Sequence, residues 1–579
     1  MRNILFKKGL IIGIIGLLIL TTILPATGTL INKNIKLEEQ NTSDKQDNPI
    51  NSNSDSIDWW PMYQHDPQNT GYSTSKAPNT NNVLWTYNAK KCRGLLSCPV
   101  VVDGRVYIGG DGEDLRWFRL IEKDLGGKLY CIDATTGGHL WMIDYPIEGN
   151  LHNNILAAPV VDEDKVFVCP MSDDNPYGEI HCYNALNGDL LWEKKDIGGV
   201  SFEGITVSNG KLYAIALVDG FFYRKVYCLN TTNGDILWDF YEEGLNGCPA
   251  VVNNKVYICR RIGDGNFNDV YCLNASSGDP IWNWQAPYNI KFGDSPTVID
   301  DKLYICAEGL FEIPGAIFCI NAQNGDTIWM SEVRNNFRRS VAYYNSKIYA
   351  QCYDMFYCFN ADTGKLIWKQ KIQVAVDQTL PIIADNKVFI YSPSHFNLKY
   401  YCFDALTGNI IWTLKIPGFF TLCLGSAIAD GQLYFPFGNQ MIGEDGTVYC
   451  ISDIDSNAPE APEINGPTSG KPGIIYNYSI MATDPNGDDI YYYITWGDGT
   501  KDEWFGPYSS GETVSINHSW SDKGQYEIRA RAKDSNELRG AIGILKFTMP
   551  RAKSISNSPL LRFLERYPLL YKIYNFFVK

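Results

Sequence analysis

The chain lacks the short motifs that mark the common catalytic centres. It contains no Gly-x-Ser-x-Gly elbow, no His-Glu-x-x-His pair and no phosphate-binding loop, so nothing supports a serine hydrolase, a zinc metalloprotease or a P-loop enzyme. No Cys-x-x-Cys occurs, and histidine and cysteine do not cluster at zinc-ligand spacing. The six histidines are scattered along the chain, which is more typical of structural than of catalytic histidines.

An excess of positive charge is also missing. Lys and Arg number 50 against 65 Asp and Glu, which gives a formal net charge of −15. No basic stripe interrupts this acidic balance. Because such a surface repels phosphate backbones and anionic lipid heads, we expect no nucleic-acid partner.

The N-terminus carries the information about the compartment. Three basic residues precede an uncharged run over 9–32, and small residues allow a cut after Gly28. Residues 1–28 are therefore predicted to be a secretory signal peptide or, if uncut, a membrane anchor that contacts the bilayer. Either way we expect the rest of the chain to be exported, to the cell surface or the extracellular space. Residues 29–57 are mostly polar and predict a disordered linker.

One segment recurs along the chain and ends in tryptophan. The first full copy runs Tyr130-Cys131-Ile132-Asp133-Ala134, followed by Gly137 and Trp141. The equivalent tryptophans of the later copies are Trp192, Trp238, Trp282, Trp329, Trp368 and Trp412. An eighth copy begins at Cys450 but stops before its tryptophan, and the missing residue stands at the other end of the repeats as Trp85.

A second element precedes each copy and consists of two short apolar segments around a polar turn, as in residues 100–108. Each unit thus offers four short strands, which is the scale of a propeller blade. We predict an all-β chain with an eight-bladed β-propeller over residues 58–452. Because a single blade cannot bury both faces, the ring must close, and we expect residues 83–87 to pair with the strand around Tyr449.

The repeated pattern small-x-[Asp/Asn]-Ala-x-x-Gly-x-x-x-Trp resembles the tryptophan-docking repeat of quinoprotein-like propellers. The lead-in Trp60-Pro61-Met62-Tyr63-Gln64-His65-Asp66 is also similar to theirs. We expect each repeat tryptophan to pack flat between blades, with its indole N–H bonded to a carbonyl. The eight repeat cysteines, which stand where the family usually has Ala, lie too far apart to pair and are predicted to be small buried residues. One or two bridges among the other eight cysteines stay open.

Loop lengths distinguish the two faces of the predicted disc. The short turns fall on one face, and the long connections share the other, where binding residues usually gather. We predict a polar pocket at the mouth of the central channel on the long-loop face, for a small anion, a sugar or a peptide. Its candidate ligand-binding residues are Arg93, His152, Asn154, Glu203, Arg260, Asp294, Arg338, Arg339 and Asp377. The alternative is a solvated rim of ordinary charges.

The resemblance implies either a cofactor enzyme or a binding scaffold. Catalytic members of the quinoprotein family usually place adjacent cysteines against pyrroloquinoline quinone (PQQ), with a bound calcium and an aspartate base. This sequence holds no adjacent pair of cysteines, which argues against PQQ, and no cofactor is expected. The chain looks closer to non-catalytic relatives such as the outer-membrane assembly scaffold lipoprotein, which bind partners through the same disc.

A second domain is predicted over residues 453–549. Pro459 and Pro462 break the rhythm of the repeats and mark a linker, and from there to residue 549 apolar and polar side chains alternate. Trp496-Gly497-Asp498-Gly499-Thr500, followed by His518-Ser519-Trp520, resembles the polycystic-kidney-disease (PKD)-type module, an immunoglobulin-like β-sandwich. Asp498 is expected to shape a tight turn through side-chain-to-backbone bonds. The acidic loop Asp484, Asn486 and Asp488 offers oxygen ligands for calcium but equally fits a plain Asx turn. Residues 550–579 predict an amphipathic tail for a membrane or a partner, or else a disordered end.

Together these features favour an exported binding or scaffold protein, whose loop-rich propeller face engages a surface protein or a glycan. The sandwich would then contact a surface, a carbohydrate or a protein. A PQQ-dependent alcohol or sugar dehydrogenase is the enzymatic alternative. A structural surface-layer or adhesion component is a third hypothesis.

Overall fold

The computed structural model describes residues 57–549, except 90–95, 111–126, 146–152, 156, 173–178, 196, 198, 220–222, 262–267, 287–289, 293–294, 310–314, 332, 334–336, 338, 374–378, 394–396, 418–420, 423–424 and 440–445. The predictions for the signal peptide or anchor, for the linker up to residue 56 and for the C-terminal tail lie outside these residues. In the part of the chain that is described, no helix is long and apolar enough to cross a membrane.

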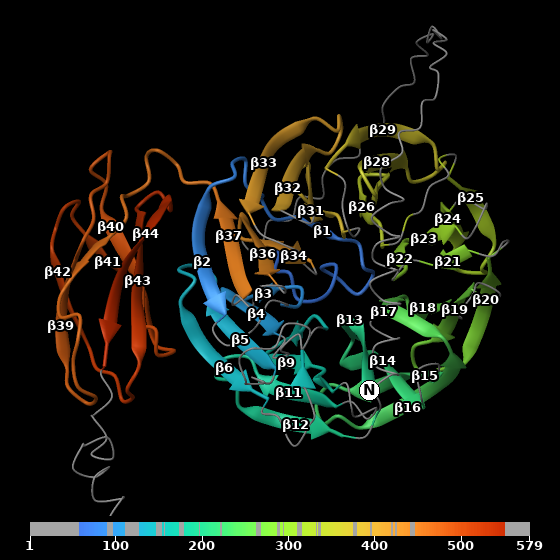
Figure 1. Ribbon diagram of the computed structural model, residues 1–579, viewed down its shortest axis with the longest axis horizontal. Coiled ribbons are helices and arrows are strands. Elements are labelled where there is room, and N and C mark those ends of the chain that lie inside the picture. The colour runs from blue at the N-terminus through green and yellow to red at the C-terminus, as the bar shows by residue number, and fades with distance from the viewer. Residues whose placement is uncertain are drawn as a thin grey trace, which may run out of the picture. The chain divides into compact units, whose positions relative to one another are not determined.

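The described residues between 72 and 452 form eight sheets of four or five strands each (Figure 1), which are numbered here as blades. Blades 1 to 4 are β3 (Val100–Val102), β4 (Arg105–Gly110), β5 (Lys128–Asp133) and β6 (His139–Asp144); β8 (Val160–Asp162), β9 (Lys165–Val168), β11 (Ile180–Asn184) and β12 (Leu190–Lys194); β13 (Gly199–Ser208), β14 (Lys211–Asp219), β15 (Tyr223–Asn230) and β16 (Ile236–Glu243); and β17 (Leu245–Val252), β18 (Lys255–Arg261), β19 (Asn268–Asn274) and β20 (Pro280–Gln285). Strands β7 (Asn153–Asn154) and β10 (Met171–Ser172) pair separately.

Blades 5 to 8 repeat the pattern, with small additions. They are β21 (Ile290–Phe292), β22 (Thr297–Ile299), β23 (Lys302–Gly309), β24 (Ala316–Asn321) and β25 (Thr327–Met330); β26 (Ala342–Tyr344), β27 (Lys347–Cys352), β28 (Met355–Asn360) and β29 (Leu366–Lys371); β1 (Tyr72–Ser73), β30 (Ile382–Ala384), β31 (Lys387–Pro393), β32 (Asn397–Asp404) and β33 (Ile410–Pro417); and β34 (Thr421–Leu422), β35 (Ala427–Ala429), β36 (Gln432–Asn439), β37 (Gly446–Ser452) and β2 (Val83–Ala89). The prediction of an all-β propeller is confirmed.

Blade 8 is closed by a strand from the other end of the repeats. β2 is the outermost strand of that sheet and runs antiparallel to β37, with Thr86 opposite Tyr449 and Trp85 opposite Cys450. The predicted pairing of residues 83–87 with the strand around Tyr449 is therefore confirmed. The two ends of the repeat region share one sheet, so opening the ring costs the whole ladder between β2 and β37.

Each repeat tryptophan docks on an aromatic ring of its own blade, and seven of the eight, all but Trp412, also face a glycine in a turn of the next blade. In all eight blades the tryptophan lies 5.8–6.0 Å, centroid to centroid, from a Tyr or Phe of the second strand. Seven indole N–H groups donate to a backbone carbonyl at 3.0–3.3 Å, as predicted. Trp282 is the exception, because its buried indole nitrogen has no acceptor among the described residues.

The repeat cysteines are confirmed as small core residues. Each is fully buried, and none is in a disulfide: Cys131, Cys182, Cys228, Cys272, Cys319, Cys358, Cys402 and Cys450. Burial raises the pKa of these thiols, to about 11 for Cys228 and Cys272. They are therefore neutral apolar fillers at ordinary pH.

The lead-in before β2 runs along the inner edges of the blades. Carbonyls of the lead-in accept the backbone N–H of one residue in the innermost strand of six blades: Val101, Val161, Val251, Val298, Tyr343 and Ile383, at 2.6–3.0 Å. Asn69 adds side-chain bonds to the carbonyls of Cys248 and Pro296. Because unpaired strand edges at the centre of a ring would leave buried N–H groups without acceptors, the lead-in completes the propeller from inside.

Two ion pairs, which join His65 to Asp58 and to Asp66 and are called the clasp below, hold this lead-in in place. His65 Nε2 lies 3.1 Å from Asp58 Oδ1, and His65 Nδ1 lies 3.4 Å from Asp66 Oδ2. Burial alone would lower the pKa of His65, but the hydrogen bonds and charges of both carboxylates outweigh it and raise the pKa to about 9. Burial alone would raise the pKa of Asp58, but bonds from His65 and Thr74 hold it well below its ordinary value.

A β-sandwich follows the propeller. One sheet holds β38 (Glu463–Asn465), β39 (Tyr476–Met481) and β42 (Val514–His518), and the other holds β41 (Lys501–Tyr508), β40 (Ile490–Thr495), β43 (Gln525–Asp534) and β44 (Arg539–Thr548). Trp496 and Trp520 fill its core, and Trp520 Nε1 donates to the carbonyl of Trp496 at 3.1 Å. Asp498 Oδ1 accepts the N–H and hydroxyl of Thr500, so the predicted tight turn is confirmed.

The tryptophan docking predicts that Gly278→Ala destabilises the ring. A Cβ at Gly278 would lie 2.6 Å from Trp238 Cε3, at a φ of +80°. The positive φ costs about 1–2 kcal/mol for alanine, and forcing the indole aside adds about 1–3 kcal/mol. Gly104→Ala is the matched control, because Gly104 has a φ of +67° but no atom within 4 Å of a new Cβ. Urea unfolding of both variants measures the difference; equal losses of unfolding free energy would contradict tryptophan docking.

The clasp predicts a pH dependence. A pKa of His65 raised from 6.5 to about 9 gives stability that is complete below pH 6.5 and is lost as the pH rises through 9. The lowered pKa of Asp58 gives stability that is present above pH 3.8 and lost on acidification. The gap in melting temperature between the parent and His65→Gln is therefore expected to shrink from pH 6 to pH 10. A gap that stays constant over this range would show that His65 is not charged in the folded protein.

Candidate functional site

Most of the residues predicted to line the mouth of the central channel are not among the described residues. Arg93, His152, Asp294, Arg338 and Asp377 lie outside the described residues. Asn154 lies in β7 and Glu203 in β13, and the two remaining residues, Arg260 and Arg339, are described in full. The pocket at the mouth therefore stays a prediction.

Arg260 is engaged by its own blade 4 and by the last strand of blade 3. Its guanidinium donates to Asp269 Oδ2 at 2.8 Å, to the carbonyl of Glu243 at 3.0 Å, and lies 3.2 Å from Glu242 Oε1. Arg339 is partly buried near Cys98, where burial raises the pKa of the thiol to about 12 and the charge of Arg339 opposes the rise. Arg260 thus joins β18 to β19 and to β16 of blade 3, and a ligand at the mouth would have to compete with the carboxylates of Asp269 and Glu242 for it.

The acidic loop of the sandwich forms the Asx turn. Asp484 Oδ1 accepts the N–H of Asn486 at 2.9 Å and of Asp488 at 3.0 Å. Asp484 Oδ2 and Asp534 Oδ2 are buried without a hydrogen-bond partner among the described residues, which is the condition that a cation relieves. Calcium at this loop stays a prediction.

A junction between the ring and the sandwich, which the sequence analysis did not foresee, is built on Asp133. This residue ends β5 and is fully buried. Tyr493 donates its hydroxyl to Asp133 Oδ2 at 2.6 Å, and Lys501 Nζ lies 3.9 Å from the same oxygen. Thr136 donates its N–H and hydroxyl to Oδ1 at 2.9 Å. Burial raises the pKa of Asp133, and these partners oppose the rise.

Close packing fixes the junction at blade 1. Thr136 Oγ1 lies 2.9 Å from Thr495 Oγ1, and a Cβ on Gly138 would lie 2.3 Å from that oxygen. The other full repeats carry a longer polar side chain at the position of Gly138: Asp189, Asp235, Asp279, Asp326, Lys365 and Asn409. The sandwich therefore fits against blade 1 in a way that these six blades exclude.

The exposure of the residue before each repeat tryptophan also shows that the sandwich covers blades 8 and 1. Leu84 of blade 8 and Leu140 of blade 1 are buried. Their equivalents in the other six blades are 43–48% exposed: Leu191, Leu237, Ile281, Ile328, Ile367 and Ile411. Ile542 of the sandwich packs against the cluster that contains Leu84. The sandwich thus shields apolar side chains that the rest of the ring leaves in solvent.

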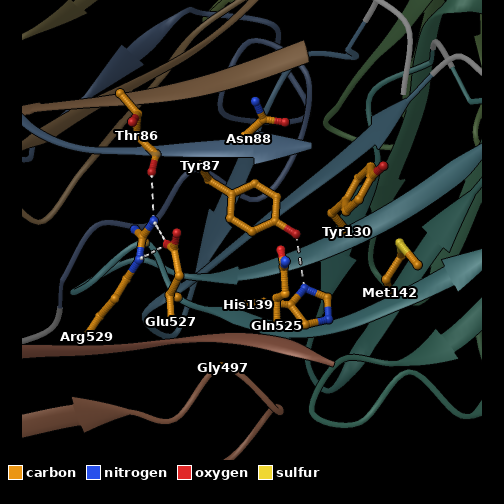
Figure 2. A pocket seen from close by; sticks show the side chains of 12 residues that line it. Thr86, Tyr87, Asn88, Tyr130, His139, Met142, Gly497, Gln525, Glu527 and Arg529 are labelled. Atoms are coloured by element: carbon orange, nitrogen blue, oxygen red, sulfur yellow. Dashed lines mark hydrogen bonds and ion pairs between the residues drawn. The ribbon is translucent and has the colours of Figure 1, made fainter. Parts of the chain in front are cut away.

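A cleft of about 410 Å³ opens beside this junction (Figure 2). β2, β5 and β6 supply its ring side, and the turn at Gly497 and β43 supply its sandwich side. The lining is Thr86, Tyr87, Asn88, Tyr130, Gly137, Gly138, His139, Met142, Gly497, Gln525, Glu527 and Arg529. It combines aromatic rings, side-chain amides and one ion pair, and its volume falls in the range of ligand sites.

The polar groups of the cleft are held in place by the fold. Tyr87 OH lies 3.0 Å from His139 Nδ1, and the two rings stack at 6.3 Å (Figure 2). Arg529 bonds to Glu527 Oε2 at 2.8 Å and to the carbonyl of Thr86 at 3.1 Å. Burial raises the pKa of Tyr87, so its hydroxyl stays neutral and can donate or accept a hydrogen bond. Such fixed groups suit recognition of a polar, uncharged ligand.

Comparison with known proteins supports the repeat architecture. The repeat family described as outer membrane protein assembly factor BamB matches residues 74–239, 223–310 and 314–456, more than half of the chain. Among solved structures, BamB from Moraxella catarrhalis is 14% identical, covers 64% of this chain and 97% of that chain, with a TM-score of 0.47. The PKD domain of an M14-like peptidase from a Thermoplasmatales archaeon is 49% identical, covers 17% of this chain and 100% of that domain, with a TM-score of 0.16.

Two curated relatives are dehydrogenases by name. The 1-butanol dehydrogenase (cytochrome c) of Thauera butanivorans is 24% identical over 148 residues, which are 24% of this chain and 19% of the relative. The quinohemoprotein alcohol dehydrogenase of Comamonas testosteroni is 31% identical over 94 residues, 15% of this chain and 11% of the relative. The chain thus spans about a fifth or less of the length of either relative.

Proposed function

The chain belongs to the family of the outer membrane protein assembly factor BamB, and we propose that it is an exported binding or scaffold protein rather than an enzyme. The loop-rich propeller face and the docked sandwich act together in this proposal. The observation that carries it is the cleft at the junction, because both modules contribute lining side chains to one cavity.

A glycan is the ligand class that the cleft chemistry favours. Sugars bind through aromatic faces and through hydrogen bonds from amides and fixed charged pairs. Tyr87 and His139 supply the rings, and Gln525 and Asn88 are exposed amides at the edge of the cleft. A protein partner that presents a polar loop would use the same groups, and the loops of the propeller face would extend the contact.

The proposal predicts glycan binding that depends on the cleft. The full chain is applied to a glycan array, and the Kd of retained glycans is measured for the parent and for Gln525→Ala and Tyr87→Ala. Loss of one hydrogen bond to a bound ligand costs about 1–3 kcal/mol, so the affinity is expected to fall about fivefold or more. Tyr241→Ala is the matched control, because Tyr241 is 51% exposed on an outer strand and does not line the cleft.

Two results would contradict glycan binding at the cleft. One is a glycan affinity that Gln525→Ala and Tyr87→Ala leave unchanged. The other is an array on which nothing is retained while the purified chain associates with itself, which would favour the structural surface-layer or adhesion alternative.

The dehydrogenase alternative rests on the two curated relatives, which this chain matches over short segments. The absence of adjacent cysteines in the sequence stands against it. Incubating the purified chain with PQQ and calcium, followed by an assay of dye reduction with primary alcohols and sugars, separates the two functions. Sustained turnover would overturn the binding proposal.

A further inference from the structure

Blade 2 departs from the repeat at the residue before its cysteine. Seven blades carry an aromatic residue there: Tyr130, Tyr227, Tyr271, Phe318, Tyr357, Tyr401 and Tyr449. Blade 2 alone carries a histidine, His181, which is 8% exposed. A histidine buries less apolar surface than the ring it replaces and adds a nitrogen lone pair, so the exchange brings a possible metal ligand to this position at some loss of apolar packing.

Two glutamates converge on this histidine. Glu179 precedes β11, and Glu193 lies directly opposite His181 on β12. One ligand atom from each of Glu179, His181 and Glu193 lies within 4.8 Å of the other two. His181 Nε2 and Glu179 Oε2 are 2.6 Å apart, and Glu193 Oε1 lies 3.2 Å from Lys195 Nζ at the surface.

In blade 3 the positions equivalent to Glu179, His181 and Glu193 hold residues with a purely structural role. There the equivalents of Glu179, His181 and Glu193 are Lys225, Tyr227 and Asp239. Lys225 Nζ pairs with Asp239 Oδ2 at 2.6 Å and lies over the ring of Tyr227, so the set is electrically balanced. In blade 2 the lysine is replaced by a second carboxylate. Lys195 offsets the charge of Glu193, so the two glutamates and this lysine leave one net negative charge around the imidazole.

The far side of the imidazole is fixed by a pair of tyrosines. Tyr183 OH lies 2.9 Å from His181 Nδ1, and Tyr145 OH lies 2.6 Å from Tyr183 OH. The Tyr183 hydroxyl can therefore accept a hydrogen bond from the Nδ1–H of His181. An oxygen on Nδ1 is the usual outer-shell partner of a metal-bound histidine, because it leaves the lone pair on Nε2.

We propose that Glu179, His181 and Glu193 bind a divalent transition-metal ion of the Zn²⁺ type on blade 2. Imidazole with carboxylates suits such ions, whereas calcium prefers oxygen ligands alone. Zinc bonds of about 2.0–2.2 Å place neighbouring ligand atoms about 3.3 Å apart, so the Nε2–Oε2 contact has to open by less than about 1 Å. Three protein ligands leave the fourth position to water or to a group from a partner.

Metal binding requires only that the neutral imidazole of His181 change its tautomer, so that no proton is gained or lost. If Nε2 carries the imidazole proton in the empty site, it donates to Glu179; on binding, the proton moves to Nδ1 and faces Tyr183. The metal then takes the Nε2 lone pair and one oxygen from each glutamate. The site lies away from the cleft at the junction, so this inference is independent of the proposed function.

The test uses the full chain after treatment with a chelator. Zinc is titrated against a chromophoric competitor, and Co²⁺ is titrated with its visible absorption as the signature of nitrogen and oxygen ligands. We expect one site whose affinity falls at least about tenfold in His181→Tyr, since even outer-shell changes cost about 10–100-fold. His181→Tyr restores the residue of the other blades, so it keeps the fold. Tyr183→Phe removes the oxygen on Nδ1, together with the partner of Tyr145 OH, and is expected to lower the zinc affinity about tenfold.

Asp239→Asn is the matched control, because it changes the equivalent of Glu193 in blade 3 and leaves zinc binding intact. Equal melting temperatures of parent and His181→Tyr without metal verify the fold. Either of two results would overturn the proposal: a zinc isotherm that His181→Tyr and Glu193→Gln leave unchanged, or the absence of any Co²⁺ absorption band in the parent chain.

Discussion

The pairing of β2 with β37 is the constraint on which the rest of the structure depends. Each blade buries its faces only against its neighbours, so the ring is stable when the last sheet contains a strand from the first part of the chain. The lead-in then seals the inner edges, and Trp412 Nε1 donates to the carbonyl of Pro78 in the same lead-in. Closure is thus supported at the rim by β2 and at the centre by the residues that precede it.

The same closing strand places the sandwich. Thr86 of β2 offers its carbonyl to Arg529, and Tyr87 lines the cleft. Asp133 of blade 1, next along the ring, accepts the hydroxyl of Tyr493. A buried carboxylate that bonds to three partners tolerates little displacement, so the two modules meet in one orientation. The cleft is a consequence of this orientation, because neither module encloses it alone.

The sequence predicts the ring because its signals are local and repeated. The glycine turns, the buried cysteines and the split eighth copy each follow from spacing and from the demand that sheets be covered. The partners across the junction have no such signal, since Asp133 and Tyr493 stand 360 positions apart. Gly138 departs from the other full repeats, which carry a longer polar side chain there, but the sequence does not say what fills the space. The role of the lead-in is hidden for the same reason, because its bonds use backbone carbonyls that any residue possesses. His181 is also a departure from the repeat, and its meaning becomes visible once its neighbours Glu179 and Glu193 are placed in space.

The measurement that tests this account most directly is differential scanning calorimetry of the full chain and of Gly138→Asp. A junction closed by Asp133, Thr495 and Arg529 predicts that propeller and sandwich unfold in one transition. Gly138→Asp, which installs the side chain found in blade 2, is expected to split that transition into two. Two separate transitions in the parent, or a single unaltered transition in the variant, would contradict the account.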